Sequence, residues 1–312
     1  MSEAPFRILS LDGGGIRGLF TASFLIHIEE ETNTRLIDHF DLLVGTSTGS
    51  IIALGLAAGV PAREILSFYQ RDGPKIFAGG SKWRWAFGPK YKNAALSSAI
   101  RTILGDKTLG ELLVPVCVPS HELVDGHPRV FKDDHHHTLH WGGHQPVWKV
   151  AMASTAAPTY FPSFQIEGHD AHIDGGIWAN NPIVVGITEA VKYFEQPLSN
   201  IAALSVGTGS LVPRLSHGQA KRRGLIGWGR GARLLSVVMD AQAQSAHYTA
   251  CHLLSGNHYL RVDADLNQQI QLDSYNDAAP LIERGKQAGR KYKNQVAADF
   301  LAWPSRGITG SQ

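Results

Sequence analysis

The order of apolar and polar residues predicts short buried strands that alternate with amphipathic helices. Runs dominated by apolar residues, as expected for strands covered on both faces, occupy residues 6–11, 42–44, 114–119, 201–206 and 256–263. Apolar residues recur at helical spacing over residues 19–31, 51–58, 61–71, 94–104, 182–194, 231–254 and 278–303. A short edge hairpin is predicted at residues 166–173. Because the chain shows no internal repeat, low-complexity tract or linker, the sequence predicts a single α/β domain over residues 1–312.

Composition narrows the class of protein. A chain of 312 residues with 43% hydrophobic residues can bury a substantial core, and a net charge of +2 is too small to indicate a nucleic acid polymer as partner. The two cysteines, Cys117 and Cys251, lie far apart and form no C-x-x-C motif, which suits a reducing compartment. The longest apolar run, residues 51–60, is too short to cross a bilayer, and the N-terminus lacks the apolar core of a secretion signal. These features predict a soluble cytoplasmic protein.

A nucleophile motif lies between a predicted strand and a predicted helix. Gly45-Thr46-Ser47-Thr48-Gly49 matches G-x-S-x-G, follows the strand at 42–44 and precedes the helix at 51–58. A strand that reverses sharply into a helix strains the backbone at the serine, and a Cβ at Gly45 or Gly49 would clash. The turn places the Ser47 hydroxyl beside the first N–H groups of a helix, which favours a nucleophile that passes through an oxyanion. An ordinary Gly/Ser turn is the alternative.

A glycine-rich loop follows the first predicted strand. Gly13, Gly14 and Gly15 precede Arg17, and the helix at 19–31 comes next. Such a loop brings backbone N–H groups together around negative charge. A phosphate loop would require a Lys-Ser/Thr pair, which is absent, and a dinucleotide loop would require a later strand that ends in an acidic residue. An oxyanion hole requires only two or three converging donors, so this loop is a candidate for that role.

An acidic turn follows the predicted hairpin. Asp174 at a strand end, followed by Gly175 and Gly176, is well placed to face a neighbouring loop as a general base, although Asp/Gly turns are common. A dry apolar site would raise the pKa of this carboxyl from about 3.9 and make it a better base. The chain also holds 15 histidines, so a Ser-His-Asp triad stays open, with His217, His247, His252 and His258 as candidates.

Three further stretches stand out by composition. Residues 152–162 are small and end in two prolines, which indicates close approach to another backbone. Residues 121–144 hold seven histidines; without a nearby cysteine or an H-E-x-x-H motif, they indicate a solvated loop rather than a metal site. Residues 72–93 and 211–233 mix basic with aromatic residues, a pattern typical of a membrane interface, of nucleotide stacking or of a surface loop. The residues concerned are Lys75, Lys82, Trp83, Arg84, Trp85, Phe87, Lys90, Tyr91, Lys92, Lys221, Arg222, Arg223, Trp228, Arg230 and Arg233.

Four sequence blocks occur in a fixed order: DGGGIRG at 12–18, GTSTG at 45–49, ASTAAPTYFP at 153–162 and DGG at 174–176. Together they resemble the patatin-like phospholipases. The resemblance implies a three-layer α/β/α fold with a mostly parallel central sheet. It also implies a lipid acyl hydrolase of phospholipase A type that acts on membrane phospholipids without a metal or other cofactor.

The same resemblance assigns roles to individual residues. Ser47 would be the nucleophile and Asp174 the base of a dyad without histidine, and Gly13, Gly14 and Gly15 would form the oxyanion hole. Arg17 would support the geometry of this loop, and Gly45, Gly49, Gly175 and Gly176 would shape the two catalytic turns.

The chain is also similar to patatin-like effectors of anti-phage systems, which a cyclic nucleotide activates to degrade the membrane of the cell. This resemblance implies an antiviral, cytoplasmic enzyme that is peripheral to the inner membrane when active and binds a cyclic dinucleotide, and it leaves a homo-oligomer open. Two other classes are considered: a nucleotide-binding module with an inert Ser47, and a serine esterase or peptidase that acts on non-lipid substrates.

Overall fold

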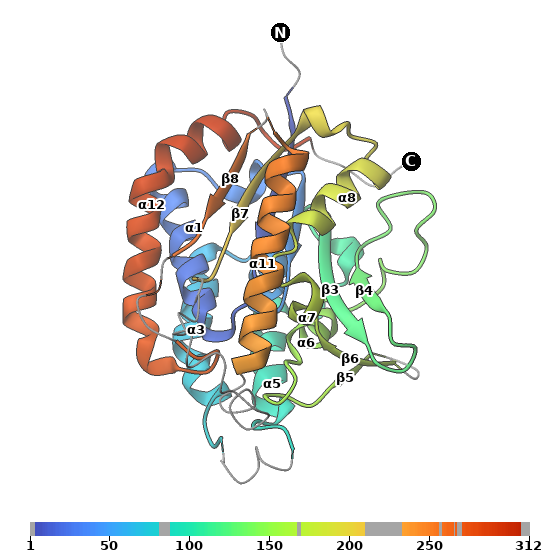
Figure 1. Cartoon of the computed structure of the whole chain (residues 1–312), viewed down its shortest axis with the longest axis vertical. Coiled ribbons are helices and arrows are strands. Elements are labelled where there is room, and N and C mark those ends of the chain that lie inside the picture. The colour runs from blue at the N-terminus through green and yellow to red at the C-terminus, as the bar shows by residue number, and fades with distance from the viewer. Residues whose placement is uncertain are drawn as a thin grey trace, which may run out of the picture.

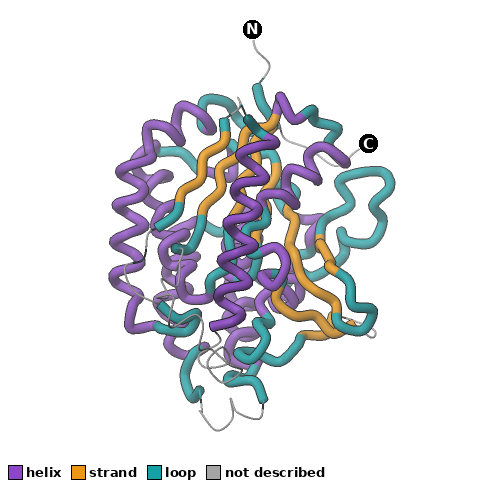
Figure 2. The backbone as a smooth tube through the Cα atoms, viewed as in Figure 1, coloured by secondary structure: helices purple, strands orange, loops and turns teal. Residues whose placement is uncertain are grey.

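A mixed β-sheet forms the centre of the molecule (Figures 1 and 2). The computed structural model describes residues 4–80, 88–166, 170–209, 233–255, 258–264, 266 and 270–306. In these residues the strands are ordered β5-β6-β3-β2-β1-β7-β8, and β4 also pairs with β3. Strands β3, β2, β1, β7 and β8 pair in parallel. At one end of the sheet, β4 and β6 each pair antiparallel with β3, and β5 pairs antiparallel with β6. The strands are β1 (Phe6–Leu11), β2 (Leu42–Gly45), β3 (Val116–Glu122), β4 (Pro128–Phe131), β5 (Phe164–Ile166), β6 (Asp170–Asp174), β7 (Ile201–Val206) and β8 (Tyr259–Val262).

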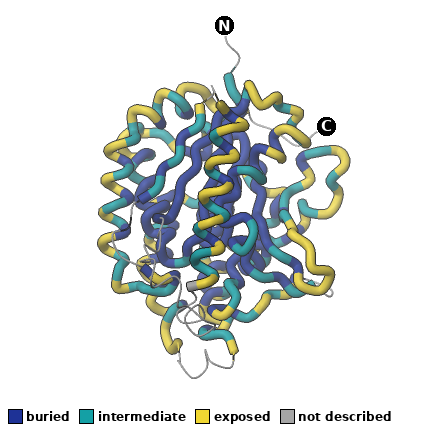
Figure 3. Tube along the Cα trace, in the orientation of Figure 1, coloured by how far each residue is buried: buried dark blue, intermediate teal, exposed yellow. Residues whose placement is uncertain are grey.

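Helices cover both faces of the sheet. Successive residues of a strand point to opposite faces, so strands made mainly of apolar residues need cover on both sides. On β1, Leu9 and Leu11 belong to one apolar cluster and Phe6 and Ile8 to another. The first cluster includes α1 (Gly18–Thr32), α2 (Thr48–Ala57), α3 (Ala62–Ile76), α5 (Asn93–Leu104), α6 (Val147–Thr155) and α12 (Ala278–Phe300). The second includes α8 (Ile183–Tyr193) and α11 (Arg233–Leu253), and Figure 3 shows the strands buried between the two layers. The predicted three-layer α/β/α fold is confirmed.

The remaining elements are short. α7 (Gly176–Ala179) follows β6 directly, and single-turn 3₁₀ helices occur at Gly15–Arg17, Leu36–Asp38, Leu109–Glu111, Leu198–Asn200 and Tyr275–Asp277. In the described part of the chain, no helix has both the length and the apolar character that a bilayer span requires.

Several predicted boundaries differ from the structure, and three of them concern α2 and α3. α2 begins at Thr48, immediately after Ser47, rather than at residue 51. α3 continues to Ile76 with Pro74 inside the helix, past the predicted end at residue 71. Pro74 has no N–H to donate to the Gln70 carbonyl four residues earlier. The Tyr275 hydroxyl donates to this carbonyl instead, at 2.7 Å, so a residue distant in the sequence compensates for the proline inside the helix. Pro61, predicted as the first helical residue of this helix, precedes it as the N-cap.

Candidate active site

Ser47 lies in a strained turn between β2 and α2. Its backbone has φ 54° and ψ −123°, a conformation that costs free energy for a residue with a Cβ. A Cβ at Gly45 would lie 2.3 Å from the Gly49 carbonyl oxygen, and a Cβ at Gly49 would lie 2.2 Å from the Leu11 carbonyl oxygen. The two glycines are therefore required by close backbone contact, as the sequence predicted.

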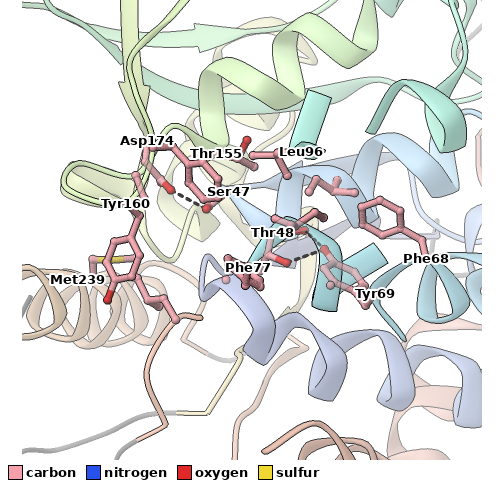
Figure 4. Close-up of a pocket in the computed structure, with 17 residues that line it drawn as sticks. Ser47, Thr48, Phe68, Tyr69, Phe77, Leu96, Thr155, Tyr160, Asp174 and Met239 are labelled. Atoms are coloured by element: carbon pink, nitrogen blue, oxygen red, sulfur yellow. Dashed lines mark hydrogen bonds between the residues drawn. The ribbon is translucent and has the colours of Figure 1, made fainter. Parts of the chain in front are cut away.

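Asp174 meets Ser47 across the site, although the two residues are 127 positions apart. The Ser47 hydroxyl donates to Asp174 Oδ2 at 2.6 Å, and the Gly176 N–H donates to Asp174 Oδ1 at 2.7 Å; Figure 4 shows the Ser47 and Asp174 side chains pointing toward each other. Burial raises the pKa of the Asp174 carboxyl to about 6, even though both hydrogen bonds favour the charged form. The position of Gly175 is tight as well, because a Cβ there would lie 2.3 Å from the Pro119 carbonyl oxygen.

The raised pKa of Asp174 gives a pH prediction. If Asp174 accepts the proton of Ser47, it must be ionised, so reactivity is expected to be half-maximal near pH 6 and to fall about tenfold for each pH unit below that. The second-order rate of labelling by a fluorophosphonate between pH 4.5 and 8 measures this directly, with far-UV circular dichroism at each pH as the control for folding. A labelling rate that stays at its plateau down to pH 4.5 would contradict the prediction.

The glycine-rich loop lies beside this pair, and its three N–H groups differ in availability. The Gly13 N–H donates to the Asn180 carbonyl at 2.9 Å, so this group is engaged within the protein. The N–H groups of Gly14 and Gly15 make no hydrogen bond to any described residue. Gly15 has φ +58°, and a Cβ there would lie 2.3 Å from the Leu272 carbonyl oxygen. The oxyanion-hole candidates in this loop thus narrow to Gly14 and Gly15.

The sequence motifs did not point us to a further backbone donor, Thr48. Thr48, the first residue of α2, also has an N–H without a hydrogen bond to any described residue. In nucleophile elbows the N–H after the nucleophile commonly serves the oxyanion. The G-x-S-x-G motif itself was the signal that could have identified Thr48.

Buried charges hold the glycine-rich loop in place. Arg17 Nη1 donates to the Gly209 carbonyl at 2.8 Å and Arg17 Nε to the Gly14 carbonyl at 3.3 Å, so this side chain ties the loop to the residues that follow β7. Arg261 on β8, which the sequence did not single out, donates to both carboxylate oxygens of Asp12, at 2.8 and 2.6 Å. Burial raises the pKa of Asp12 to about 6, even though the positive charge of Arg261 acts to lower it.

An apolar cavity of about 60 Å³ adjoins Ser47 and Asp174. Its walls come from several helices and from the segments that follow α6 and precede α12 (Figure 4). Apolar and aromatic side chains dominate the lining: Ile51, Phe68, Tyr69, Ile76, Phe77, Leu96, Tyr160, Phe161, Met239 and Leu272. A nucleophile and a carboxylate beside such a surface can cleave an ester whose acyl part is apolar.

Comparison with known proteins identifies the family. Residues 9–187 match the family described as patatin-like phospholipase, and this range contains the glycine-rich loop, Ser47 and Asp174. The chain belongs to this family. The predicted family and the predicted class of enzyme, a lipid hydrolase, are confirmed.

Relatives of this patatin-like phospholipase extend the similarity beyond residue 187. A cGAMP-activated phospholipase of Vibrio cholerae is 35% identical, with 96% of this chain and 95% of the relative covered. A protein of the same name from Escherichia coli is 32% identical, with coverage of 96% and 94%. Among solved structures, VipD from Legionella pneumophila has a TM-score of 0.51 at 12% identity and covers 94% of this chain and 67% of its own, which supports the fold.

Among the described residues, the alternative partners His247, His252 and His258 make no hydrogen bond or ion pair with Ser47 or Asp174. His247 Nδ1 is 2.9 Å from the Tyr259 hydroxyl, and His258 Nδ1 is 3.1 Å from a carboxylate oxygen of Asp299. His252 is exposed near the end of α11. His217 lies outside the described residues.

The histidine-rich residues 121–144 are only partly a solvated loop. The side chain of His135 is buried between two carboxylates, with Nδ1 2.8 Å from Asp133 and Nε2 2.9 Å from Glu189. Burial lowers the pKa of His135, but the hydrogen bonds to Asp133 and Glu189 outweigh it and raise the pKa to about 9. This histidine therefore anchors the loop to α8. Among the described residues, no group of three or more His, Cys, Asp or Glu side chains could hold a metal ion.

Most residues of the two basic and aromatic stretches, 72–93 and 211–233, are not among the residues that the structure describes. Residues 81–87 and 210–232, which include most of the tryptophans and cations noted above, are not among the described residues. Within the described part, Tyr91 is buried against Phe77 and Phe161, and its hydroxyl donates to Asp273 at 2.6 Å. The Tyr91 ring therefore packs inside the protein, against two residues that line the cavity, Phe77 and Phe161.

Proposed function

We propose that the protein is a serine lipid acyl hydrolase that cleaves carboxylic esters of membrane phospholipids through a Ser47–Asp174 dyad. The observation that carries this proposal is the 2.6 Å hydrogen bond from the Ser47 hydroxyl to Asp174, beside an apolar cavity. Because the carboxyl has a pKa of about 6, it is ionised at neutral pH and basic enough to assist the hydroxyl.

The proposed reaction has two halves. In the first, Ser47 Oγ attacks the ester carbonyl while its proton passes to Asp174. The N–H groups of Gly14, Gly15 and Thr48, which bond to no described residue, stabilise the negative oxygen. The tetrahedral intermediate collapses, the C–O bond breaks, and the lysophospholipid leaves with the proton from Asp174. In the second half, Asp174 deprotonates a water molecule that attacks the acyl-enzyme, and the fatty acid leaves as Ser47 regains its proton.

We further propose that a cyclic dinucleotide activates this enzyme at the membrane surface. The relatives in Vibrio cholerae and Escherichia coli are named cGAMP-activated phospholipases and match nearly the whole chain. The size of the cavity supports a closed resting site, because about 60 Å³ is small beside the roughly 300–1,000 Å³ of pockets that enclose drug-sized ligands. Activation would then widen the cavity for an acyl chain and favour peripheral binding to the inner membrane, and a homo-oligomer and a role in antiviral defence are compatible with this regulation.

Mass spectrometry of lipids in treated vesicles tests both parts of the proposal. Vesicles of phosphatidylethanolamine and phosphatidylglycerol are expected to yield free fatty acid and lysophospholipid in the presence of cGAMP, and much less without it. Ser47→Ala protein serves as the control for contaminating lipase. Equal rates with and without cGAMP would reject the activation but leave the hydrolase.

Two outcomes would replace the proposed substrate or chemistry. Hydrolysis of a soluble short-chain ester without any lipid product, with or without cGAMP, would favour a non-lipid serine esterase. Binding of a nucleotide by a protein that no fluorophosphonate labels would favour a binding module with an inert Ser47.

A further inference from the structure

The last turn of α6 contacts both members of the catalytic pair. Ser154 Oγ accepts a hydrogen bond from the Ser47 N–H at 2.9 Å, and two residues later the Ala156 carbonyl accepts one from the Asp174 N–H at 3.0 Å. Ser47 and Asp174 sit at the ends of different strands, β2 and β6, which are not neighbours in the sheet. The C-terminal end of α6, together with the residue that follows it, therefore links the backbones of Ser47 and Asp174.

The Ser154 hydroxyl is itself fixed by the sheet. It donates to the Pro119 carbonyl in β3 at 2.6 Å while it accepts from Ser47, so both of its hydrogen-bonding directions are defined. The side chain is fully buried, and among the described residues the Ser47 N–H has no other hydrogen-bond partner.

The strained backbone of Ser47 makes this contact important. At φ 54° and ψ −123° the Ser47 peptide has turned away from the ladder of β2, so its N–H needs an acceptor outside the strand. Ser154 supplies that acceptor. Without it, a buried N–H would be left unpaired at the residue whose orientation directs the nucleophile toward Asp174.

We propose that Ser154 is a positioning residue for the reaction: its hydroxyl holds the backbone of Ser47 so that Oγ stays within hydrogen-bonding distance of Asp174. Ser154 acts through Ser47 and does not touch the substrate. The inference rests on the proposed function and explains the third sequence block, residues 153–162. Small residues there allow α6 to approach the nucleophile turn and β3 closely enough for one hydroxyl to bridge them.

The chain contains a matched control for this position. Ser120 in β3 is also fully buried, and its hydroxyl oxygen lies 3.0 Å from the Ile173 carbonyl, 3.3 Å from the Ala153 carbonyl and 3.4 Å from His172 Nδ1. It makes no side-chain contact with Ser47. Ser154→Ala and Ser120→Ala thus remove the same group from equally buried sites, and only the first removes a partner of the nucleophile.

The test compares kcat, KM and pH dependence for both variants under the conditions in which the wild type is active. Ser154→Ala is expected to lower kcat by about 10- to 100-fold with KM within twofold, because the reacting oxygen is misplaced after the substrate has bound. Its acid limb is expected to move to higher pH, since the Ser47 hydrogen bond that favours ionised Asp174 is weakened. Ser120→Ala is expected to keep kcat within threefold and the acid limb unchanged.

A second variant separates hydrogen bonding from packing. Ser154→Cys fills the site with a weaker acceptor, so it is expected to lose kcat nearly as far as Ser154→Ala, and it decides the question if the alanine variant does not fold. Wild-type kcat and an unchanged acid limb in Ser154→Ala or Ser154→Cys would overturn the inference, as would an equal loss in Ser120→Ala. If the wild type is not labelled by a fluorophosphonate at all, the proposed function fails instead.

Discussion

Replacing Ser47 by alanine, or Asp174 by asparagine, is expected to lower phospholipid hydrolysis by at least about 10³-fold. The first change removes the nucleophile. The second keeps the shape of the side chain but removes the group that accepts the proton, and the hydrogen bond at Oδ2 would no longer join a hydroxyl to a carboxylate. Release of fatty acid from vesicles, measured under the conditions of maximal wild-type activity, gives the magnitude. Thermal unfolding of each variant shows whether the fold is retained.

Histidine variants provide the control for this prediction. His247→Ala, His252→Ala and His258→Ala are expected to keep activity within a few-fold, because none of these side chains contacts Ser47 or Asp174 in the described structure. His217, which lies outside the described residues, belongs in the same series. A histidine variant as inactive as Asp174→Asn would replace the dyad with a triad.

The parts of the site that could be predicted are those fixed by local backbone geometry. A serine in a strand-to-helix reversal needs glycine on both sides, and this need is visible in five consecutive residues, Gly45 to Gly49. The sheet could be predicted equally well, because strands buried on both faces are dominated by apolar residues, as β1, β2 and β7 are.

The parts that could not be predicted depend on contacts between distant residues. The sequence near Pro74 does not indicate that Tyr275 donates a hydrogen bond to the Gln70 carbonyl, which the proline cannot pair with. The same holds for Gly13, whose N–H is taken by the Asn180 carbonyl, and for Ser154, whose partners are more than 30 residues away. A motif identifies residues with an unusual backbone conformation. It does not show which of their N–H and C=O groups are left without a partner in the protein and can bind a substrate.

The ion pair beneath the glycine-rich loop gives the second large prediction. Arg261→Met is expected to lower the free energy of unfolding by about 3–5 kcal/mol, because Asp12 would remain buried without its charged partner. For a chain of this size the midpoint of thermal unfolding should fall by roughly 6–15 °C. Activity should fall as well, since Asp12 immediately precedes the loop that carries Gly14 and Gly15.

Two comparisons separate this effect from a general loss of charge. Arg63→Met, which breaks an exposed ion pair with Glu30, is expected to change the free energy of unfolding by less than about 1 kcal/mol. Adding Asp12→Asn to Arg261→Met should recover part of the loss, because the unpaired carboxylate is removed.

The pH dependence of the same variant tests the electrostatic cause. The pKa of Asp12 in the folded wild type is raised to about 6, and loss of Arg261 would raise it further. The stability difference between Arg261→Met and the wild type is therefore expected to be largest above pH 7 and to shrink as Asp12 takes up a proton below pH 6. Chemical unfolding at pH 5 and pH 8 measures both differences. An equal loss at the two pH values would show that packing of the Arg261 side chain, rather than its charge, holds the loop in place.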